Sequence, residues 1–200
     1  MKFQFSIPDK FTVHDLDGTH RLILGNLPNE IFSGLEFPEI WDMHPEKFHE
    51  ISIHGKKVKT PRWQQAYGKN YQYTGSINNA LTIPNKLTPV HVWCKEYIYD
   101  GLNGLLLNWY EGGLKHYIGK HRDSTVNMIK GTPIVTLSLG EERIFRLRLF
   151  RGKGMMDFTA SNGSMFIMPY NTNKAFTHEV PHFSRNIGRR ISITFRAFIS

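Results

Sequence analysis

Residues 106–123 read Leu-Leu-Asn-Trp-Tyr-Glu-Gly-Gly-Leu-Lys-His-Tyr-Ile-Gly-Lys-His-Arg-Asp, and the rest of the chain is organised around this stretch. Tyr117, Ile118 and the glycines around them predict a strand that is entered through a tight turn. Residues two apart on a strand point to the same face. His121 and Asp123 would therefore converge on one point, as two of the three ligands of a non-haem Fe(II) site do.

The His-x-Asp pair alone is a weak signal, because a chain with ten histidines produces such triplets by chance. A surface turn would explain it as well. A rival pair, His44 and Glu46, encloses Pro45, and proline disfavours a central strand, so we expect a loop or a helix start there. Before the two glycines of the quoted stretch, a second strand would place Asn108 and Tyr110 on one face.

The composition of the 200 residues is that of a globular protein, with 40% hydrophobic and 13% aromatic residues, and the length suits a single domain. The chain has no apolar run of membrane-spanning length, so we expect no membrane partner. The N-terminus lacks the apolar segment and cleavage site of a signal peptide. We therefore expect an intracellular protein, in the nucleus or cytoplasm, and read Cys94 as a buried thiol.

Positive charge is unevenly distributed within the net charge of +8. Residues 1–50 contain 4 Lys or Arg against 9 Asp or Glu, whereas residues 51–100 contain 7 against 2. One short segment, Lys56-Lys57-Val58-Lys59-Thr60-Pro61-Arg62, concentrates basic residues. Clustered Lys and Arg favour the phosphates of a nucleic acid, although solubility alone would also explain the charge.

The order of elements predicts an α+β, mainly β fold. Helix-like sequence spans 27–49, interrupted by Pro38 and Pro45, and recurs over 89–99, while residues 50–58 predict a hairpin that turns at Gly55. From residue 103 onward, eight short apolar runs separated by turn signals indicate a sandwich or barrel. These runs are 105–110, 117–120, 133–139, 143–150, 155–159, 164–168, 176–180 and 190–198.

Residues 190–196 alternate polar and apolar side chains over their whole length. On a strand, the polar face would carry Arg190, Ser192, Thr194 and Arg196. Such a face cannot meet an apolar core without partners, so it faces either water or an acidic ligand. Two arginines on one face suit a small dicarboxylate, because a guanidinium binds a carboxylate through two hydrogen bonds. Upstream, His178 is the candidate for a third metal ligand, and His182 is the competing choice.

With these pieces in place, the chain resembles the AlkB family of Fe(II)- and 2-oxoglutarate-dependent dioxygenases, nearest the eukaryotic-type nucleic-acid demethylases. The resemblance covers roughly residues 50–200, and the order and spacing of its motifs carry it. The motifs are Pro61-Arg62-Trp63-Gln64-Gln65-Ala66-Tyr67-Gly68, Tyr71-Gln72-Tyr73-Thr74-Gly75, Asn108-x-Tyr110, His121-x-Asp123, Pro133-Ile134-Val135-Thr136-Leu137-Ser138-Leu139-Gly140, His178-Glu179-Val180-Pro181 and Arg190-x-Ser192-x-Thr194-x-Arg196.

The resemblance implies a double-stranded β-helix, or jelly roll, in one domain. Residues 1–102 would form an N-terminal extension of helices with a nucleotide-recognition hairpin and lid, and residues 103–200 the catalytic β core. The implied cofactor is Fe(II), with 2-oxoglutarate and O2 as co-substrates. The implied iron ligands are His121, Asp123 and His178.

The same resemblance assigns the two ends of 2-oxoglutarate to different residues. The distal carboxylate would be held by Arg190 with Asn108 and Tyr110, and the end that chelates iron by Arg196 with Ser192. The family usually has Asn where Ser192 stands. Serine donates a single hydrogen bond, so we expect weaker binding of the co-substrate.

The implied activity is oxidative demethylation of N-alkylated bases such as N1-methyladenine and N3-methylcytosine in DNA, releasing formaldehyde, succinate and CO2. The protein is expected to act as a monomer. RNA is the alternative substrate. Hydroxylation of a protein and a catalytically silent jelly-roll binder of nucleic acid are the other two classes that we consider.

Base recognition follows from the resemblance as well. Tyr73 would stack on a flipped base opposite His121, and Tyr71 would contact the base edge, although ordinary strand packing also explains both tyrosines. The hairpin tip Ile53-His54-Gly55 matches a duplex-probing finger. Further substrate contacts are expected from Lys56, Lys57, Lys59 and Arg62.

Thr125 stands where repair members of the family usually carry an acidic residue that contacts the methylated, cationic base. Two consequences are open at this point. The site accepts neutral lesions, or a carboxylate from Glu141, Glu142 or Glu179 takes the place of the missing one.

Overall fold

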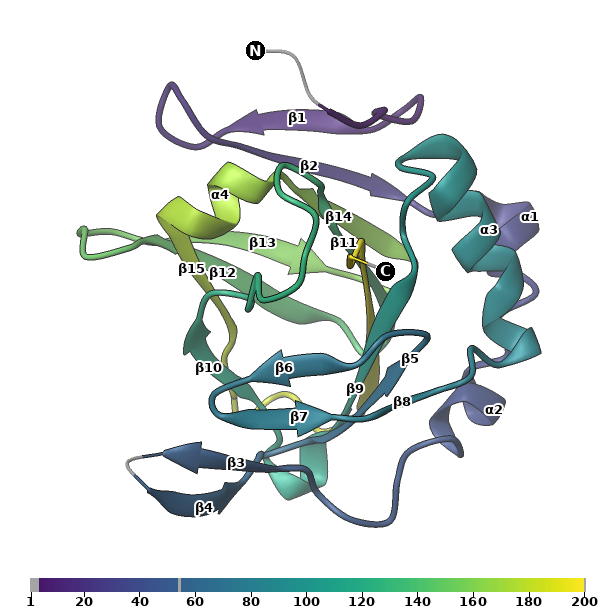
Figure 1. Ribbon diagram of the computed structural model, residues 1–200, viewed down its shortest axis with the longest axis vertical. Coiled ribbons are helices and arrows are strands. Elements are labelled where there is room, and N and C mark those ends of the chain that lie inside the picture. Colours follow the sequence, from purple (N-terminus) through teal and green to yellow (C-terminus); the bar gives the residue numbers. More distant parts are fainter. Residues whose placement is uncertain (1–3, 54, 200) are drawn as a thin grey trace.

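Two β-sheets form the framework of the computed structural model, which describes residues 4–53 and 55–199 (Figure 1). The larger sheet has eight strands, in the order β1 (Thr12–Asp15), β2 (Arg21–Asn26), β14 (Ser164–Met168), β11 (Ile134–Gly140), β16 (Arg189–Arg196), β9 (Gly104–Glu111), β5 (Trp63–Tyr67) and β8 (Ala80–Leu81). The smaller sheet has four, in the order β10 (Ile118–His121), β15 (Phe176–Val180), β12 (Arg143–Leu149) and β13 (Met156–Ala160). This arrangement confirms the predicted mainly β, jelly-roll fold.

The strands predicted after residue 103 all form. Two of them, 164–168 and 176–180, have the predicted bounds, and the others differ by a residue or two at their ends. The N-terminal half contributes more to the large sheet than its sequence suggested. β2 pairs with β14, and β5 pairs with β9, so both are interior strands of that sheet.

Short helices cover one side of the large sheet (Figure 1). They are α1 (Asn29–Phe32), α2 (Phe37–Trp41), the 3-10 turn η1 (Asn85–Leu87) and α3 (Thr88–Tyr97). Pro38 was expected to interrupt a helix, but it lies in the first turn of α2, where proline needs no hydrogen-bond partner for its nitrogen. A 3-10 turn, η2 (Gly112–Leu114), precedes β10, and α4 (Tyr170–Ala175) precedes β15. In the described part of the chain, no helix combines the length and apolar character needed to cross a membrane.

Strand alternation divides the interior into two apolar clusters. Leu105, Leu107 and Trp109 of β9 belong to the cluster beneath the helices, and the indole of Trp109 donates a hydrogen bond to the Ile40 carbonyl of α2 at 2.9 Å. Leu106 belongs to the cluster between the two sheets. Because side chains alternate, Asn108 and Tyr110 share the face of Leu106 and point between the sheets. That face carries the candidate site.

Two small hairpins project beside the sheets (Figure 1). One pairs β3 (Glu50–Ile53) with β4 (Lys56–Lys59), as predicted, and Gly55 has a φ of +77° at the turn. His54, the predicted finger residue, lies outside the described residues. The other hairpin pairs β6 (Tyr71–Tyr73) with β7 (Ser76–Asn78) and brings the two predicted lid tyrosines over the cleft.

Candidate metal centre and co-substrate cleft

His121, Asp123 and His178 come together between the sheets. His121 ends β10, and the ladder between β10 and β15 places it directly opposite His178. One ligand atom from each of the three side chains lies within 4.8 Å of the other two. The Asp123 Oδ1 atom is 3.5 Å from His121 Nε2 and 3.6 Å from His178 Nε2. Two imidazoles and a carboxylate on one side of an ion form the donor set of non-haem Fe(II) oxygenases.

Asp123 differs in position from the strand that we predicted for it. β10 ends at His121, and Asp123 lies in irregular chain just beyond. Its backbone is held by the buried side chain of Asn173 of α4 instead of a strand ladder. Its carboxylate forms an ion pair with Arg196 at 2.7 Å, which fixes Oδ2 and leaves Oδ1 toward the two histidines. The strand periodicity thus predicted that Asp123 lies near His121, but it did not predict the contacts with Asn173 and Arg196 that orient Asp123.

The protonation states of the site suit metal binding. Burial raises the pKa of the Asp123 carboxyl, but the Arg196 guanidinium and the two imidazoles outweigh it and hold that pKa well below its ordinary value. Burial, together with repulsion from His121, lowers the pKa of His178 to about 3. Asp123 is therefore an anion and His178 a neutral imidazole near neutral pH, which are the forms that bind metals.

The histidine tautomers also fit an ion at this point. His121 Nδ1 lies 2.8 Å from the Gly119 carbonyl oxygen, which can only accept a hydrogen bond. The Nδ1 atom therefore carries the proton, and the lone pair is on Nε2, the atom that faces Asp123. A metal ligand held by a backbone carbonyl in this way has a fixed ring orientation. These three residues fit a single divalent metal ion.

The co-substrate side of the cleft is built by β9 and β16. The ladder pairs Arg190 with Tyr110 and Ser192 with Asn108, so the predicted residues share one face. Arg190 is 1% exposed, and Ser192, Thr194 and Arg196 are buried too, which excludes water as the environment of this strand face. All of the predicted co-substrate residues line one cleft with the three metal ligands: Asn108, Tyr110, Arg190, Ser192 and Arg196.

Arg190 has unused capacity to bind an anion. Its Nε donates to the hydroxyl of Ser138 at 3.0 Å, and its guanidinium lies 5.1 Å from the centre of the Tyr110 ring. Its Nη1 is buried without a hydrogen-bond partner among the described residues. Burial lowers the pKa of this guanidinium, Tyr110 offsets only part of that effect, and repulsion from Arg143 lowers the pKa further. A buried cation with a free N–H fits the distal carboxylate of 2-oxoglutarate.

Arg196 occupies the junction between the two halves of the cleft. Its Nη2 donates to Asp123, its guanidinium lies 4.5 Å from the centre of the Tyr71 ring, and its Nε has no hydrogen-bond partner in the described structure. Although burial opposes it, Asp123 raises the pKa of Arg196. The free Nε near the metal ligands suits the end of 2-oxoglutarate that chelates the metal.

Arg62, a predicted substrate contact, lies in the wall of the cleft and is buried. Its Nε donates to Asn108 Oδ1 at 2.8 Å and its Nη2 to Gln64 Oε1 at 3.2 Å. Sequence reasoning missed Gln64 as a cleft residue and Ser138 as the partner of Arg190, although both lie in the quoted motifs. The strand register gives the signal that could have found Gln64, since it stands opposite Asn108.

The two lid tyrosines differ in their surroundings. Tyr73 is half-buried, and its ring centre lies 6.2 Å from that of His121, with the rings nearly perpendicular. Tyr71 is buried, and its hydroxyl accepts a hydrogen bond from the Ser124 N–H at 3.2 Å. Tyr73 thus lies beside His121, whereas Tyr71 also binds the backbone next to Asp123.

The glutamates considered as substitutes for an acidic residue at position 125 lie outside the cleft. Glu179 pairs with Arg148 at 3.0 Å, and Glu141 pairs with Arg143 at 2.7 Å. Neither of them, nor Glu142 or Thr125, is among the described residues that line the cleft. Among the described residues, Asp123 is the acidic residue that lines the cleft, and its ion pair with Arg196 already neutralises its charge.

The other predicted residues that the structure describes lie outside the cleft. In the described part of the chain, His182 does not join the metal cluster, and His44 and Glu46 lie in the loop after α2. Lys56, Lys57 and Lys59 are exposed on β4. Cys94 is buried in α3, as expected, and burial raises the pKa of its thiol.

Comparison with known sequences identifies relatives that cover most of this chain. The family described as the 2OG-Fe(II) oxygenase superfamily matches residues 28–196. The DNA oxidative demethylase ALKBH2 of Homo sapiens is 28% identical over 202 residues, covering 92% of this chain and 74% of that protein. ALKBH2 of Mus musculus is 30% identical over 162 residues, covering 75% of this chain and 67% of that protein. These matches confirm the resemblance to AlkB-type dioxygenases.

Comparison with solved structures supports the same fold. The structure of OsALKBH1 superposes with a TM-score of 0.60 and covers 92% of this chain and 99% of that one. The two sequences are 14% identical, so the similarity concerns the fold alone.

Proposed function

Because the chain belongs to the 2OG-Fe(II) oxygenase superfamily, we propose that it demethylates N-alkylated DNA bases such as N1-methyladenine and N3-methylcytosine. The family gives the enzyme class, a dioxygenase that uses Fe(II), 2-oxoglutarate and O2. One observation carries the proposal: the metal ligands, the buried arginines and Tyr73 line a single cleft. The curated relatives, named as DNA oxidative demethylases, support DNA as the substrate.

His121, Asp123 and His178 would hold Fe(II), and Arg190 and Arg196 would hold the two ends of 2-oxoglutarate. When bound, Fe(II) and 2-oxoglutarate would supply the oxidation with O2: one oxygen atom of O2 enters the methyl C–H bond, and the other enters succinate as CO2 leaves. The N–CH2OH product then breaks its C–N bond, giving formaldehyde and an N–H on the base. The chain's own part is to hold the co-substrate, exclude water and aim the methyl group.

A base inside a duplex cannot reach a cleft of this kind, so the target base must leave the stack. Tyr73, beside His121, would stack on it. Exposed Lys56, Lys57 and Lys59 on the β3–β4 hairpin would contact phosphates near the extruded base. The enzyme would act as a monomer in the nucleus or cytoplasm. Residues 1–102 would provide the recognition lid and residues 103–200 the catalytic core.

Release of formaldehyde and succinate from methylated oligonucleotides tests the proposal. Single- and double-stranded DNA bearing N1-methyladenine or N3-methylcytosine, and the matching RNA, would be incubated with Fe(II), 2-oxoglutarate and O2. We expect formaldehyde in amounts equal to succinate from DNA, and no product from the Asp123→Ala variant. Succinate without formaldehyde would reject these lesions as substrates, and faster turnover of RNA would replace DNA with RNA.

A further inference from the structure

Asp123 needs an orienting partner that its own strand does not supply. β10 ends at His121, so within residues 4–53 and 55–199 no strand neighbour binds the backbone N–H and carbonyl of Asp123. Both groups are instead bound by one side chain. The Asp123 N–H donates to Asn173 Oδ1 at 2.9 Å, and Asn173 Nδ2 donates to the Asp123 carbonyl oxygen at 3.0 Å. Asn173 thus acts as a strand neighbour for a single residue.

The burial and hydrogen bonding of Asn173 suit it to hold the backbone of Asp123 in place. It is 1% exposed, and both polar atoms of its amide are used by Asp123. The next residue of α4 adds a second contact, because the Lys174 carbonyl accepts a hydrogen bond from Arg122 Nη1 at 3.0 Å. α4 therefore holds two consecutive residues of the ligand segment, 122 and 123.

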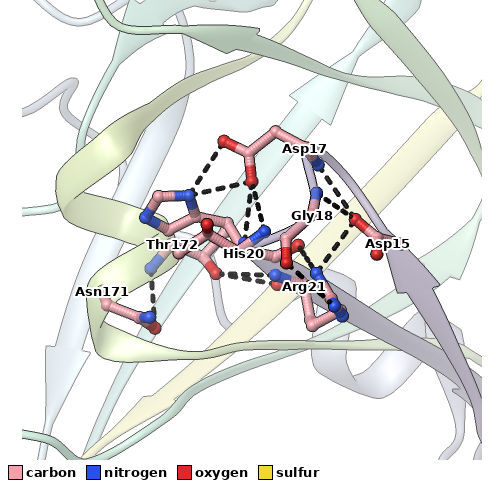
Figure 2. A network of polar contacts seen from close by, with 8 residues as sticks. Asp15, Asp17, Gly18, His20, Arg21, Asn171 and Thr172 are labelled. Carbon is pink, nitrogen blue, oxygen red and sulfur yellow. Dashed lines mark hydrogen bonds and ion pairs between the residues drawn. The ribbon is translucent and has the colours of Figure 1, made fainter. Parts of the chain in front are cut away.

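The preceding residue of α4, Thr172, is bound to the β1–β2 hairpin at Arg21 (Figure 2). Thr172 is fully buried, and its hydroxyl donates to the Arg21 carbonyl at 2.8 Å while accepting from the Arg21 N–H at 3.4 Å. Arg21 in turn pairs with Asp15 at 2.9 Å across the β1–β2 hairpin. Successive residues of α4, Thr172 and Asn173, thus each bind the backbone of a distant segment.

From this geometry we propose that Asn173 is a positioning residue for the metal centre, which orients Asp123 through its backbone. The ion pair with Arg196 fixes the far oxygen of the carboxylate, and Asn173 fixes the main chain from which the carboxylate extends. Together they set the direction of Oδ1 toward the two histidines. The inference rests on the proposed assignment of Asp123 as a metal ligand.

Amide hydrogen exchange on the metal-free protein tests the contact itself. In the wild type, the Asp123 amide should exchange slowly, although it lies outside any strand. Exchange should become much faster in Asn173→Ala and in Asn173→Leu. The leucine variant fills the same space and avoids a cavity, so it serves if the alanine variant does not fold. An Asp123 amide that exchanges in the wild type as fast as an exposed loop amide would overturn the proposal.

Titration with Co(II), a stable substitute for Fe(II), tests the consequence for the metal. We expect both Asn173 variants to bind Co(II) roughly 10- to 100-fold more weakly, as is typical when a residue that orients a metal ligand is lost, and to show an altered visible ligand-field spectrum. Asn171→Ala is the matched control, an exposed asparagine on the same helix. Equal Co(II) affinity in wild type and both Asn173 variants would overturn the positioning role.

A further variant separates this inference from the function proposed above. His121→Ala should abolish tight Co(II) binding, because it removes one of the three proposed ligands and leaves the ion pair between Asp123 and Arg196 intact. If His121→Ala bound Co(II) as well as the wild type, the metal centre would be wrong and the role of Asn173 would fall with it. If His121→Ala lost Co(II) while the Asn173 variants kept it, the metal centre would stand and only the role of Asn173 would be rejected.

Discussion

Arg190 is the residue on which co-substrate affinity should depend most. It is buried, has a free Nη1 and faces the cleft, so a carboxylate would gain charge-assisted hydrogen bonds there. We expect Arg190→Ala to raise the KM for 2-oxoglutarate about 10- to 100-fold, the value of a hydrogen bond to a charged group. Succinate production measured over a range of 2-oxoglutarate concentrations checks it.

The neighbouring Arg189 provides the control for that experiment. Its side chain is 58% exposed and pairs with Glu111 at 2.9 Å, on the other face of β16. Arg189→Ala should leave the KM for 2-oxoglutarate unchanged. If both variants shift the KM equally, the effect comes from strand stability and Arg190 does not belong to the co-substrate site.

His116 should make stability depend on pH. It is buried beside Phe48 and Trp63, its Nδ1 accepts a hydrogen bond from the Glu111 N–H, and burial lowers its pKa below the ordinary value of 6.5. The unfolded chain therefore binds a proton more readily than the folded one. Its contribution to stability is present above the unfolded pKa and is lost as pH falls through 6.5 toward the folded value.

Urea unfolding of the metal-free protein at two pH values, about 7.5 and about 5.5, checks this. Asparagine can place an acceptor where Nδ1 stands and does not titrate. We expect the free energy of unfolding to fall less between the two pH values in His116→Asn than in the wild type. An identical fall in both proteins would show that His116 does not titrate with folding.

At the scale of single residues, the sequence predicted the chemically active side chains of the site better than the residues that hold them in place. The alternation of residues 190–196 and the His-x-Asp pair located side chains that the structure does bring together. Arg62 and Asn173 were harder to place, because their partners are Asn108 and Asp123, both about fifty positions away in the chain. No local period encodes such contacts, which arise only when β5 joins β9 and α4 docks beside the ligand segment.

At the scale of elements, the β11–β12 turn should affect both stability and the cleft. Gly140 has a φ of +83°, and a Cβ at this position would meet the Arg189 carbonyl and lie 2.6 Å from the Phe37 ring. Gly140 also pairs with Arg190 in the ladder. We expect Gly140→Ala to lower the free energy of unfolding by about 2 kcal/mol or more, through backbone strain and the clash, and to raise the KM for 2-oxoglutarate.

Gly18 offers a matched control for the turn. Its φ is +81°, but a Cβ there would have no atom within 4 Å. Gly18→Ala should lower the free energy of unfolding only through backbone strain, by about 1 kcal/mol. Urea unfolding of both variants measures the difference. Equal costs at the two glycines would mean that the turn relaxes and the proximity of Arg189 does not matter.

The β3–β4 hairpin should contribute electrostatic affinity without sequence preference. Its lysines at 56, 57 and 59 are exposed and face no acidic partner among the described ion pairs. Replacing all three with alanine should weaken DNA binding for every sequence alike. It should also reduce the slope of log K against log salt by about 1 for each phosphate that the protein no longer neutralises.

Fluorescence anisotropy over a salt series, with several oligonucleotide sequences, gives that slope. The control removes three lysines elsewhere, at positions 10, 86 and 95, and so changes the net charge by the same amount. The control should leave the slope unchanged. A drop in affinity confined to one sequence, or an equal change in the control, would contradict a role for the hairpin in phosphate binding.

At the scale of the whole molecule, the strand pattern after residue 103 was sufficient to predict a mainly β fold, because each run buries one face and ends at a turn signal. The first 102 residues were harder to read. Their strands β2 and β5 are short, and their pairing with β14 and β9 is set by contacts with residues at least 38 positions away. Local pattern gives the existence of such strands, and tertiary packing alone decides which sheet they enter.

The central claim is that one cleft binds Fe(II) through His121, Asp123 and His178 and presents 2-oxoglutarate to it through Arg190. Anaerobic absorption spectroscopy tests this most directly, since 2-oxoglutarate that chelates Fe(II) produces a visible charge-transfer band. The preferred ligand variant is His121→Ala, because removing Asp123 would leave buried Arg196 unpaired and cost several kcal/mol of stability, about 3 to 5.

We expect the band to appear when the wild type receives both Fe(II) and 2-oxoglutarate, to be absent in folded His121→Ala, and to require higher 2-oxoglutarate in Arg190→Ala. A band of the same intensity in His121→Ala, or no band in the wild type, would contradict the account.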